Sequence, residues 1–283
     1  MSKILIIISI IVLSCSTYKQ DEMINLSELT IADIHAAYEA GNYSSQQLVS
    51  AYIDRIKQFD RDINAITTIN PEALAIAESL DEEYRQTGVL RPLHGIPLLV
   101  KDNINTAGLP TTGGALALQD FIPDEDAFII KKLVDAGAII VAKSNMAEWA
   151  FSAKHTESST GGTTHNPYNL DFVPAGSSGG TGAGIASNFA TIGLGTDTGN
   201  SIRGPSSHNA LVGFRSTLGL ISRSGIIPLY LRNDVVGPMC RTVADATRVM
   251  EVMTGFDPLD PLTQYSQGKI PGNYKQFYLE SIA

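Results

Sequence analysis

Apolar and polar residues alternate with a helical period in the first third of the chain. Residues 44–47 (SSQQ) form a capping-box pattern, and apolar side chains follow it at helical spacing, at Leu48, Tyr52, Ile53 and Ile56. Pro71 suits the first turn of a second helix, which extends to about Arg85. These segments predict an outer helical layer that carries no chemistry of its own.

Further along, two short apolar runs are typical of buried strands. Residues 96–101 (IPLLVK) and 138–142 (AIIVA) are almost continuously hydrophobic, as are strands that are covered on both faces. A helix is expected between them, from about Asp126 to Gly137, because glycine commonly ends a helix. A strand, a helix and a strand in this order predict an α/β architecture.

The start of the chain predicts export. Lys3 precedes an apolar run over residues 4–13, which is about half of the roughly 20 residues that a membrane-spanning helix needs. The following Ser14 and Cys15 resemble the lipobox of bacterial lipoproteins. We therefore expect residues 1–14 to be a signal peptide, Cys15 to be lipidated and residues 15–25 to form a polar tether. The mature protein would be periplasmic or on the cell surface, anchored to a bacterial membrane. An uncleaved hydrophobic anchor and a plain signal cut nearby are the alternatives.

Composition and charge exclude several classes of protein. A chain of 283 residues with 43% hydrophobic and 17% charged residues is typical of a globular protein with one or two domains. A net charge of −9 gives no basic surface for phosphate backbones, so nucleic acid is not expected as a partner. Residues 26–262 show no domain boundary, and residues 263–283 are predicted to be a loop or the start of a C-terminal half. Cys240 is expected to be a buried structural thiol.

Glycine, serine and threonine dominate residues 161–204. This belt contains runs such as residues 183–186 (AGIA) and 190–194 (ATIGL), which predict a packed helix and a buried strand and therefore argue against a flexible linker. Small residues here would let backbone segments approach one another closely. The belt matches neither G-x-x-x-x-G-K-[ST] nor G-x-G-x-x-G, so no nucleotide site is expected.

Residues 176–180 (GSSGG) also satisfy G-x-S-x-G, the nucleophile-elbow pattern, with Ser178 at the centre. The pattern requires a downstream histidine, and only His208 follows, while Pro174 interrupts the strand that should precede the elbow. The five histidines are not spaced as metal ligands, so neither a metal nor another cofactor is expected. A serine activated by a lysine remains as the hydrolytic option.

Three motifs resemble the amidase signature family. They are residues 93–103 (LHGIPLLVKDN), 176–180 (GSSGG) and 195–203 (GTDTGNSIR), and the resemblance extends over about residues 29–261. It implies a mixed β-sheet core surrounded by helices, with an α/β fold. Two departures occur, because Gly199-Asn200 stands where the family has two glycines, and Pro174-Ala175-Gly176 stands where it has a proline and two glycines.

The resemblance also implies the roles of particular residues. Ser201 would be the nucleophile, Ser177 the bridging serine after a cis peptide bond, and Lys101 the base. An oxyanion hole would be formed by the backbone amides of Thr198, Gly199, Asn200 and Ser201. Loop support would come from Ser178, Asp197 and Arg203, and the substrate-contact loop would pass near Ala150.

The implied chemistry is consistent with the residues around it. A free lysine has a pKa near 10.4, so it can act as a base at neutral pH only if burial or positive charge favours its neutral form. Lys101 follows three apolar strand residues, which predicts such a setting. The alternatives are a surface Lys101 paired with Asp102 and a Ser201 that merely caps a helix. Asparagine can adopt the left-handed conformation at modest cost, so we predict that Asn200 holds a positive-φ turn before Ser201. The competing hypothesis is that the Asn200 side chain itself donates a hydrogen bond to the oxyanion.

Together these features predict an amidase that hydrolyses a small-molecule carboxylic amide, at a carbon–nitrogen bond other than a peptide bond, through an acyl-serine intermediate. The alternatives are an esterase of the same family, one component of a tRNA-dependent amidotransferase and an inactive, truncated binding protein. Family members are considerably longer than this chain, so a C-terminal part that completes the sheet and the substrate pocket is expected to be missing. We therefore expect residues 26–283 alone to be less stable than a longer form, and weakly active or inactive.

Overall fold

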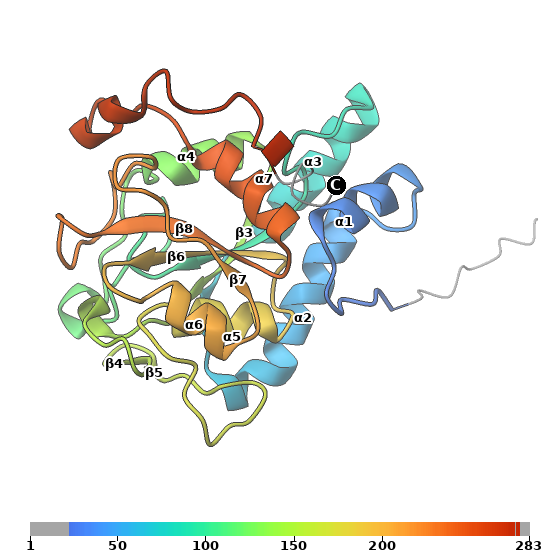
Figure 1. Ribbon diagram of the computed structural model, residues 1–283. Helices are drawn as coiled ribbons and strands as arrows, with labels where there is room; N and C mark the ends of the chain where they lie inside the picture. Colours follow the sequence, from blue (N-terminus) through green and yellow to red (C-terminus); the bar gives the residue numbers. More distant parts are fainter. Residues whose placement is uncertain (1–22, 275, 278–283) are drawn as a thin grey trace, which may run out of the picture.

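A mixed β-sheet forms the centre of the computed structural model, which describes residues 23–274 and 276–277 (Figure 1). The strands lie in the order β1-β3-β2-β6-β8-β7. Their bounds are β1 Ile66–Ile69, β2 Pro97–Lys101, β3 Ile139–Ser144, β6 Ile192–Asp197, β7 Val212–Gly213 and β8 Val235–Cys240. Strand β2 runs parallel to both β3 and β6, and the other neighbouring pairs are antiparallel. The predicted mixed sheet is confirmed.

Helices cover both faces of this sheet. Figure 1 shows α4 and α7 on one side of the sheet and α5 and α6 on the other. The helices are α1 Ile31–Glu39, α2 Ser45–Ile63, α3 Ala73–Thr87, α4 Phe128–Asp135, α5 Gly179–Ala186, α6 Arg203–His208 and α7 Val243–Met253. The remaining elements are the hairpin β4 Glu157–Ser158 with β5 Gly162–Thr163, and the 3₁₀ turns Leu116–Leu118, Glu148–Ala150 and Pro261–Ser266. The last of these turns overlaps the start of residues 263–283, for which a loop or the start of a C-terminal half was predicted.

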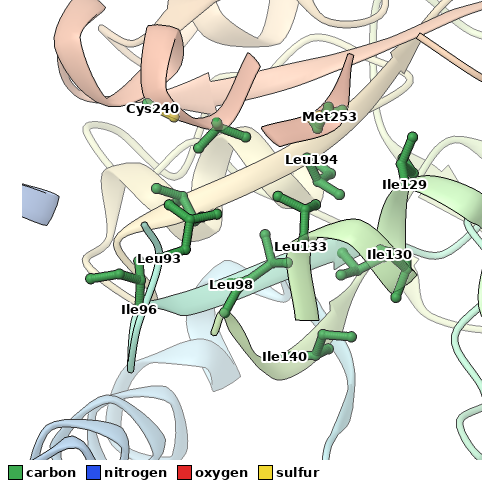
Figure 2. Packing of buried hydrophobic residues seen from close by; sticks show 14 of the residues in the cluster. Leu93, Ile96, Leu98, Ile129, Ile130, Leu133, Ile140, Leu194, Cys240 and Met253 are labelled. Carbon is green, nitrogen blue, oxygen red and sulfur yellow. The ribbon is translucent and has the colours of Figure 1, made fainter. Parts of the chain in front are cut away.

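Alternate residues of β2 belong to different hydrophobic clusters. Leu98 and Val100 pack with α4 and α7, and Figure 2 shows Leu98 near Leu133 of α4. Leu99 belongs to the cluster that includes α2, α3 and α5. This division explains why the strand is apolar at every position before Lys101. Cys240 is a buried free thiol in the first cluster, as predicted, and burial raises its pKa well above the usual range (Figure 2).

Most predicted elements form, with changes at their ends. The capping box at Ser44 and Gln47 begins α2 as predicted. Pro71 lies in the turn before α3 instead of in its first turn, because Asn70 Oδ1 accepts the Glu72 amide there. Helix α4 begins after Asp126, whose carboxylate accepts the Ala107 amide.

The predicted signal peptide and the lipidation site Cys15 lie outside the described residues. Within residues 23–274 and 276–277, no helix combines the length and the apolar character that crossing a membrane requires.

Candidate active site

Lys101 is the last residue of β2, and its side chain is completely buried. Its Nζ donates to Ser177 Oγ at 2.8 Å and to Thr196 Oγ1 at 2.7 Å. Burial lowers the pKa of Lys101 to about 7, although the charges of Asp197 and Asp234 act in the opposite direction. The alternative of a surface Lys101 paired with Asp102 is therefore wrong.

The segment that carries Ser177 passes very close to other backbone segments. A Cβ atom on Gly176 would lie 2.3 Å from the carbonyl oxygen of His155, and one on Gly180 would lie 2.2 Å from that of Asn145. Only glycine permits such approaches, as the small residues of this belt predicted. The peptide bond between Gly176 and Ser177 is cis.

Ser178 joins the start of α5 to the end of β6. Its hydroxyl donates to the Thr196 carbonyl at 3.2 Å and accepts the Thr196 amide at 3.3 Å. Its own amide donates to the Ser201 carbonyl at 3.2 Å, which brings the backbone of Ser201 beside the two serines. In the part of the chain that the structure describes, the Ser201 hydroxyl makes no hydrogen bond, so Ser201 Oγ is not joined to Ser177 Oγ.

Asp197 organises the loop between β6 and α6. Its buried carboxylate accepts the amides of Ile202 and Arg203, at 3.0 and 3.4 Å, and forms ion pairs with the side chains of Arg203 and Arg215. Burial acts to raise the pKa of Asp197, but the hydrogen bonds from Arg203 and Ile202 lower it below its ordinary value. The loop over residues 198–201 is thus held from both ends.

The backbone amides of residues 198–201 donate no hydrogen bond to any described residue. The prediction of a positive φ at Asn200 is wrong, because Asn200 is not among the residues in that conformation. The carboxylate of Asp197 folds the chain back instead, and the Asn200 side chain lies against Gly204, where a Cβ would be 2.2 Å from its Nδ2. The glycine at this position in the family is therefore not required for the turn.

Ala150 lies in a turn that is hydrogen-bonded to the segment that carries Ser177, here called the serine segment. The Ala147 amide donates to the Ser177 carbonyl at 3.0 Å, and the Trp149 amide donates to that of Gly113 at 2.8 Å. Trp149 and Ala150 both have a positive φ, of 53° and 59°. The indole of Trp149 is 42% exposed, so the turn presents an apolar surface close to Ser177.

Three further residues belong to this site that sequence reasoning missed. Thr196 Oγ1 lies between Lys101 Nζ and Asn103 Nδ2, which donates to it at 3.2 Å. Asp234, directly before β8, accepts the Thr198 hydroxyl at 2.5 Å. Thr196 and Asn103 lie inside quoted motifs, but only the fold shows their contacts, and no sequence signal marks Asp234.

A second lysine, Lys143 of β3, is also completely buried. It donates to the carbonyl of Ile104 and the hydroxyl of Thr111, both at 2.7 Å, and lies 3.9 Å from Asp102. Burial lowers its pKa to about 8, against the charges of Asp102 and Asp126. Because its donors are satisfied by the segment after β2, it holds that segment in place.

No group of three or more metal-ligating side chains occurs among residues 23–274 and 276–277. His35 Nε2 donates to the His94 carbonyl and His94 Nε2 to that of Leu80, and burial lowers the pKa of both histidines. His208 contacts the Val173 carbonyl, so it is not placed as a base for either serine.

Lys101 and Ser177 are thus in contact at the centre of a mixed sheet, and the backbone of Ser201 lies beside them. The Amidase family model matches residues 47–278, and the chain belongs to this amidase signature family.

Similar proteins include a probable amidase of Arabidopsis thaliana, 39% identical over 276 residues, which cover 95% of this chain and 54% of the relative. A glutamyl-tRNA(Gln) amidotransferase component of Alkaliphilus metalliredigens is 44% identical over 236 residues, or 83% of this chain and 48% of that protein. The native peptide amidase of Stenotrophomonas maltophilia has a TM-score of 0.82 and 43% identity, covering 87% of this chain and 51% of that one. The chain spans about half the length of the curated relatives it matches.

Proposed function

We propose that this protein hydrolyses a carboxylic amide to an acid and ammonia or an amine, with Ser201, Ser177 and Lys101 as a catalytic triad. The observation that carries the proposal is the 2.8 Å contact between Lys101 Nζ and Ser177 Oγ at a site where Lys101 is completely buried. A buried amine with a pKa of about 7 is suited to exchange a proton at neutral pH.

In the proposed reaction, Ser201 Oγ attacks the amide carbon, and its proton passes through the Ser177 hydroxyl to the neutral amine of Lys101. The amides of residues 198–201 would stabilise the oxyanion that forms. The intermediate then collapses, the C–N bond breaks, and the leaving nitrogen takes a proton back from Lys101 through Ser177. Water attacks the acyl ester on Ser201 by the same route and releases the acid.

The turn around Ala150 would contact the substrate. The hydrogen bond from the Ala147 amide to the Ser177 carbonyl supports this placement, because it holds the turn beside the segment that carries Ser177. The exposed indole of Trp149 would offer an apolar surface to the part of the substrate beyond the amide.

A fluorophosphonate probe tests the nucleophile directly, because it reacts covalently with an activated serine. The assay contains no substrate that could compete with the probe. We expect labelling of the 283-residue chain to disappear in Ser201→Ala and to fall at least a hundredfold in Lys101→Met. Labelling that persists in Ser201→Ala would refute the proposed nucleophile, and an unlabelled wild-type chain would support the inactive binding protein.

A second candidate function is favoured by the 44% identity to an amidotransferase component. In that case the same site would release ammonia from a glutamine amide for a partner. Rates on free glutamine, on a peptide amide and on the matching ester separate this candidate and the esterase from the main proposal. The amidase requires the peptide amide to be hydrolysed faster than glutamine.

We also propose that the protein is exported and anchored through a lipid on Cys15, on the evidence of the sequence of residues 1–15. Acyl chains would provide the attachment, because the apolar run is too short to span a bilayer. A precursor expressed in bacteria should partition with membranes, and Cys15→Ala should release it or leave the signal uncleaved. An unmodified mature N-terminus elsewhere, found by mass spectrometry, would refute this proposal.

A further inference from the structure

Asp234 lies where two functional segments meet. It directly precedes β8, and the register of β8 on β6 places the adjacent Val235 opposite Asp197. Its side chain is only 6% exposed. The carboxylate therefore lies at the end of the sheet from which the loop over residues 198–201 departs.

Both oxygens of this carboxylate are used. Oδ1 accepts the Thr198 hydroxyl at 2.5 Å, and Oδ2 accepts the amides of Leu229 and Tyr230, each at 2.9 Å. The carboxylate thus connects the first residue of the proposed oxyanion loop to the turn over residues 229–231. The side chains of this turn are exposed and largely apolar, with Leu231 61% exposed.

Asp234 and Asp197 differ in whether a cationic side chain pairs with them. Asp197 is paired with Arg203 and Arg215, whereas no lysine or arginine within the described ranges lies at ion-pair distance from Asp234. Arg223 acts on Asp234 only at longer range, because its guanidinium is held by Asp260 at 2.6 Å.

These two carboxylates are the charges that act on Lys101. On the neighbouring strand β3, Lys143 is occupied by the segment after β2 and by Asp102, and α5 contributes no charged residue. Asp197 has the larger effect on the amine, and Asp234, which has no ion-pair partner of its own among the described residues, adds to it.

We propose that Asp234 is a positioning residue of the proposed triad: it fixes Thr198 and the turn over residues 229–231, and its unpaired charge acts on the amine of Lys101. The inference rests on the proposed function. An opposite charge favours the protonated form of a lysine, so Asp234 raises the pH at which Lys101 becomes a base.

The test is the pH dependence of fluorophosphonate labelling in wild type and in Asp234→Asn. Loss of the charge should move the midpoint of the labelling curve to lower pH by about one unit. At a pH one unit below the wild-type midpoint, the labelling rate of each protein is expressed as a fraction of its own plateau. This fraction should be about fivefold higher for Asp234→Asn than for wild type. A merely damaged site would lose labelling at every pH, and a midpoint that stays or rises overturns the role of the charge.

Asp245→Asn is the matched control. Asp245 is also buried and accepts a threonine hydroxyl, from Thr242 at 2.9 Å, and a backbone amide, from Ile31 at 3.1 Å. It does not act on Lys101. Its variant should keep the wild-type midpoint, and an equal shift in both variants would overturn the assignment to Asp234.

Thr198 tests the positioning role without changing the charge. Thr198→Val removes the hydroxyl that Asp234 accepts, so the plateau should fall at least tenfold with the midpoint unchanged, and Thr198→Ser should restore most of it. A full plateau in Thr198→Val overturns the positioning role.

An NMR titration tests the effect of the Asp234 charge without any reaction. The ¹³Cε resonance of Lys101, followed against pH in wild type and Asp234→Asn, should show the same shift to lower pH as the labelling midpoint. If the wild type is not labelled, the proposed function fails while this titration still decides the effect of Asp234.

Discussion

At the scale of single residues, the proposed reaction depends on the protonation state of Lys101. Below pH 7 its amine is mostly protonated and cannot accept the proton of Ser201, so labelling and turnover should rise about tenfold per pH unit up to pH 7 and then level off. The pH profile of kcat/KM for an amide substrate checks this. A rate that is flat from pH 5 to 8 would contradict Lys101 as the base.

Cys240 provides the contrasting case. It is completely buried among apolar residues, and its raised pKa keeps the thiol protonated at neutral pH, so it is not a nucleophile. Cys240→Ser should retain turnover while it lowers the free energy of unfolding by about 1–3 kcal/mol, because it buries a more polar group. Active-site titration together with chemical denaturation measures both effects. Loss of turnover in a folded variant would give the thiol a role that its position does not suggest.

At the scale of elements, the end of α6 shows a conformation that favours glycine. Ala210 follows the C-cap Asn209 with a φ of 54°, and its side chain is exposed. A helix commonly has glycine at this position. Ala210→Gly should therefore raise the free energy of unfolding by about 1 kcal/mol, since little buried surface is lost.

Ala40 is the matched control for that prediction, because it is an exposed C-cap residue of α1 with an ordinary φ of −79°. Ala40→Gly should leave stability unchanged or lower it by a few tenths of a kcal/mol. Urea denaturation of both variants measures the two changes. Equal effects would mean that the left-handed conformation of Ala210 costs nothing.

The elements also show what sequence could predict. The apolar runs predicted β2 and β3, and the capping box predicted the start of α2, because these signals are local. The glycine belt predicted close backbone approach, but not that Gly180 faces the carbonyl of Asn145. Asn200 was assigned a left-handed turn that Asp197 makes unnecessary, since a single sequence does not reveal which side chain folds back on an amide.

At the scale of the molecule, the mixed sheet followed from the motifs, whereas the assembly of the site did not. Lys101 was predicted to meet Ser177, but the contribution of Thr196 and of Asp234 depends on the pairing of β6 with β8. Lys143 also follows an apolar run, but it was missed because it lies in none of the three motifs that carry the resemblance. Because two lysines are buried in one sheet, the free energy of unfolding of the whole protein should depend on pH.

Both lysines have a lower pKa in the folded protein, about 7 for Lys101 and about 8 for Lys143, than the value near 10.4 expected when unfolded. Above its folded pKa each lysine is neutral in the native state and protonated in the unfolded state, so the unfolded state binds more protons. The free energy of unfolding should therefore rise with pH, by about 1.4 kcal/mol per unit for each lysine, from pH 7 for Lys101 and from pH 8 for Lys143.

The comparison is best made below pH 8.5, before the unfolded state begins to lose the proton of Cys240, whose raised pKa acts in the opposite direction. Lys101→Met should remove most of the rise between pH 7 and 8, and Lys143→Met should leave most of it in place and reduce the slope mainly above pH 8. Urea denaturation at half-unit intervals from pH 6.5 to 8.5 gives both slopes. If the two variants keep the wild-type slope, neither lysine is neutral in the folded protein, and the account of Lys101 as a base at neutral pH fails with it.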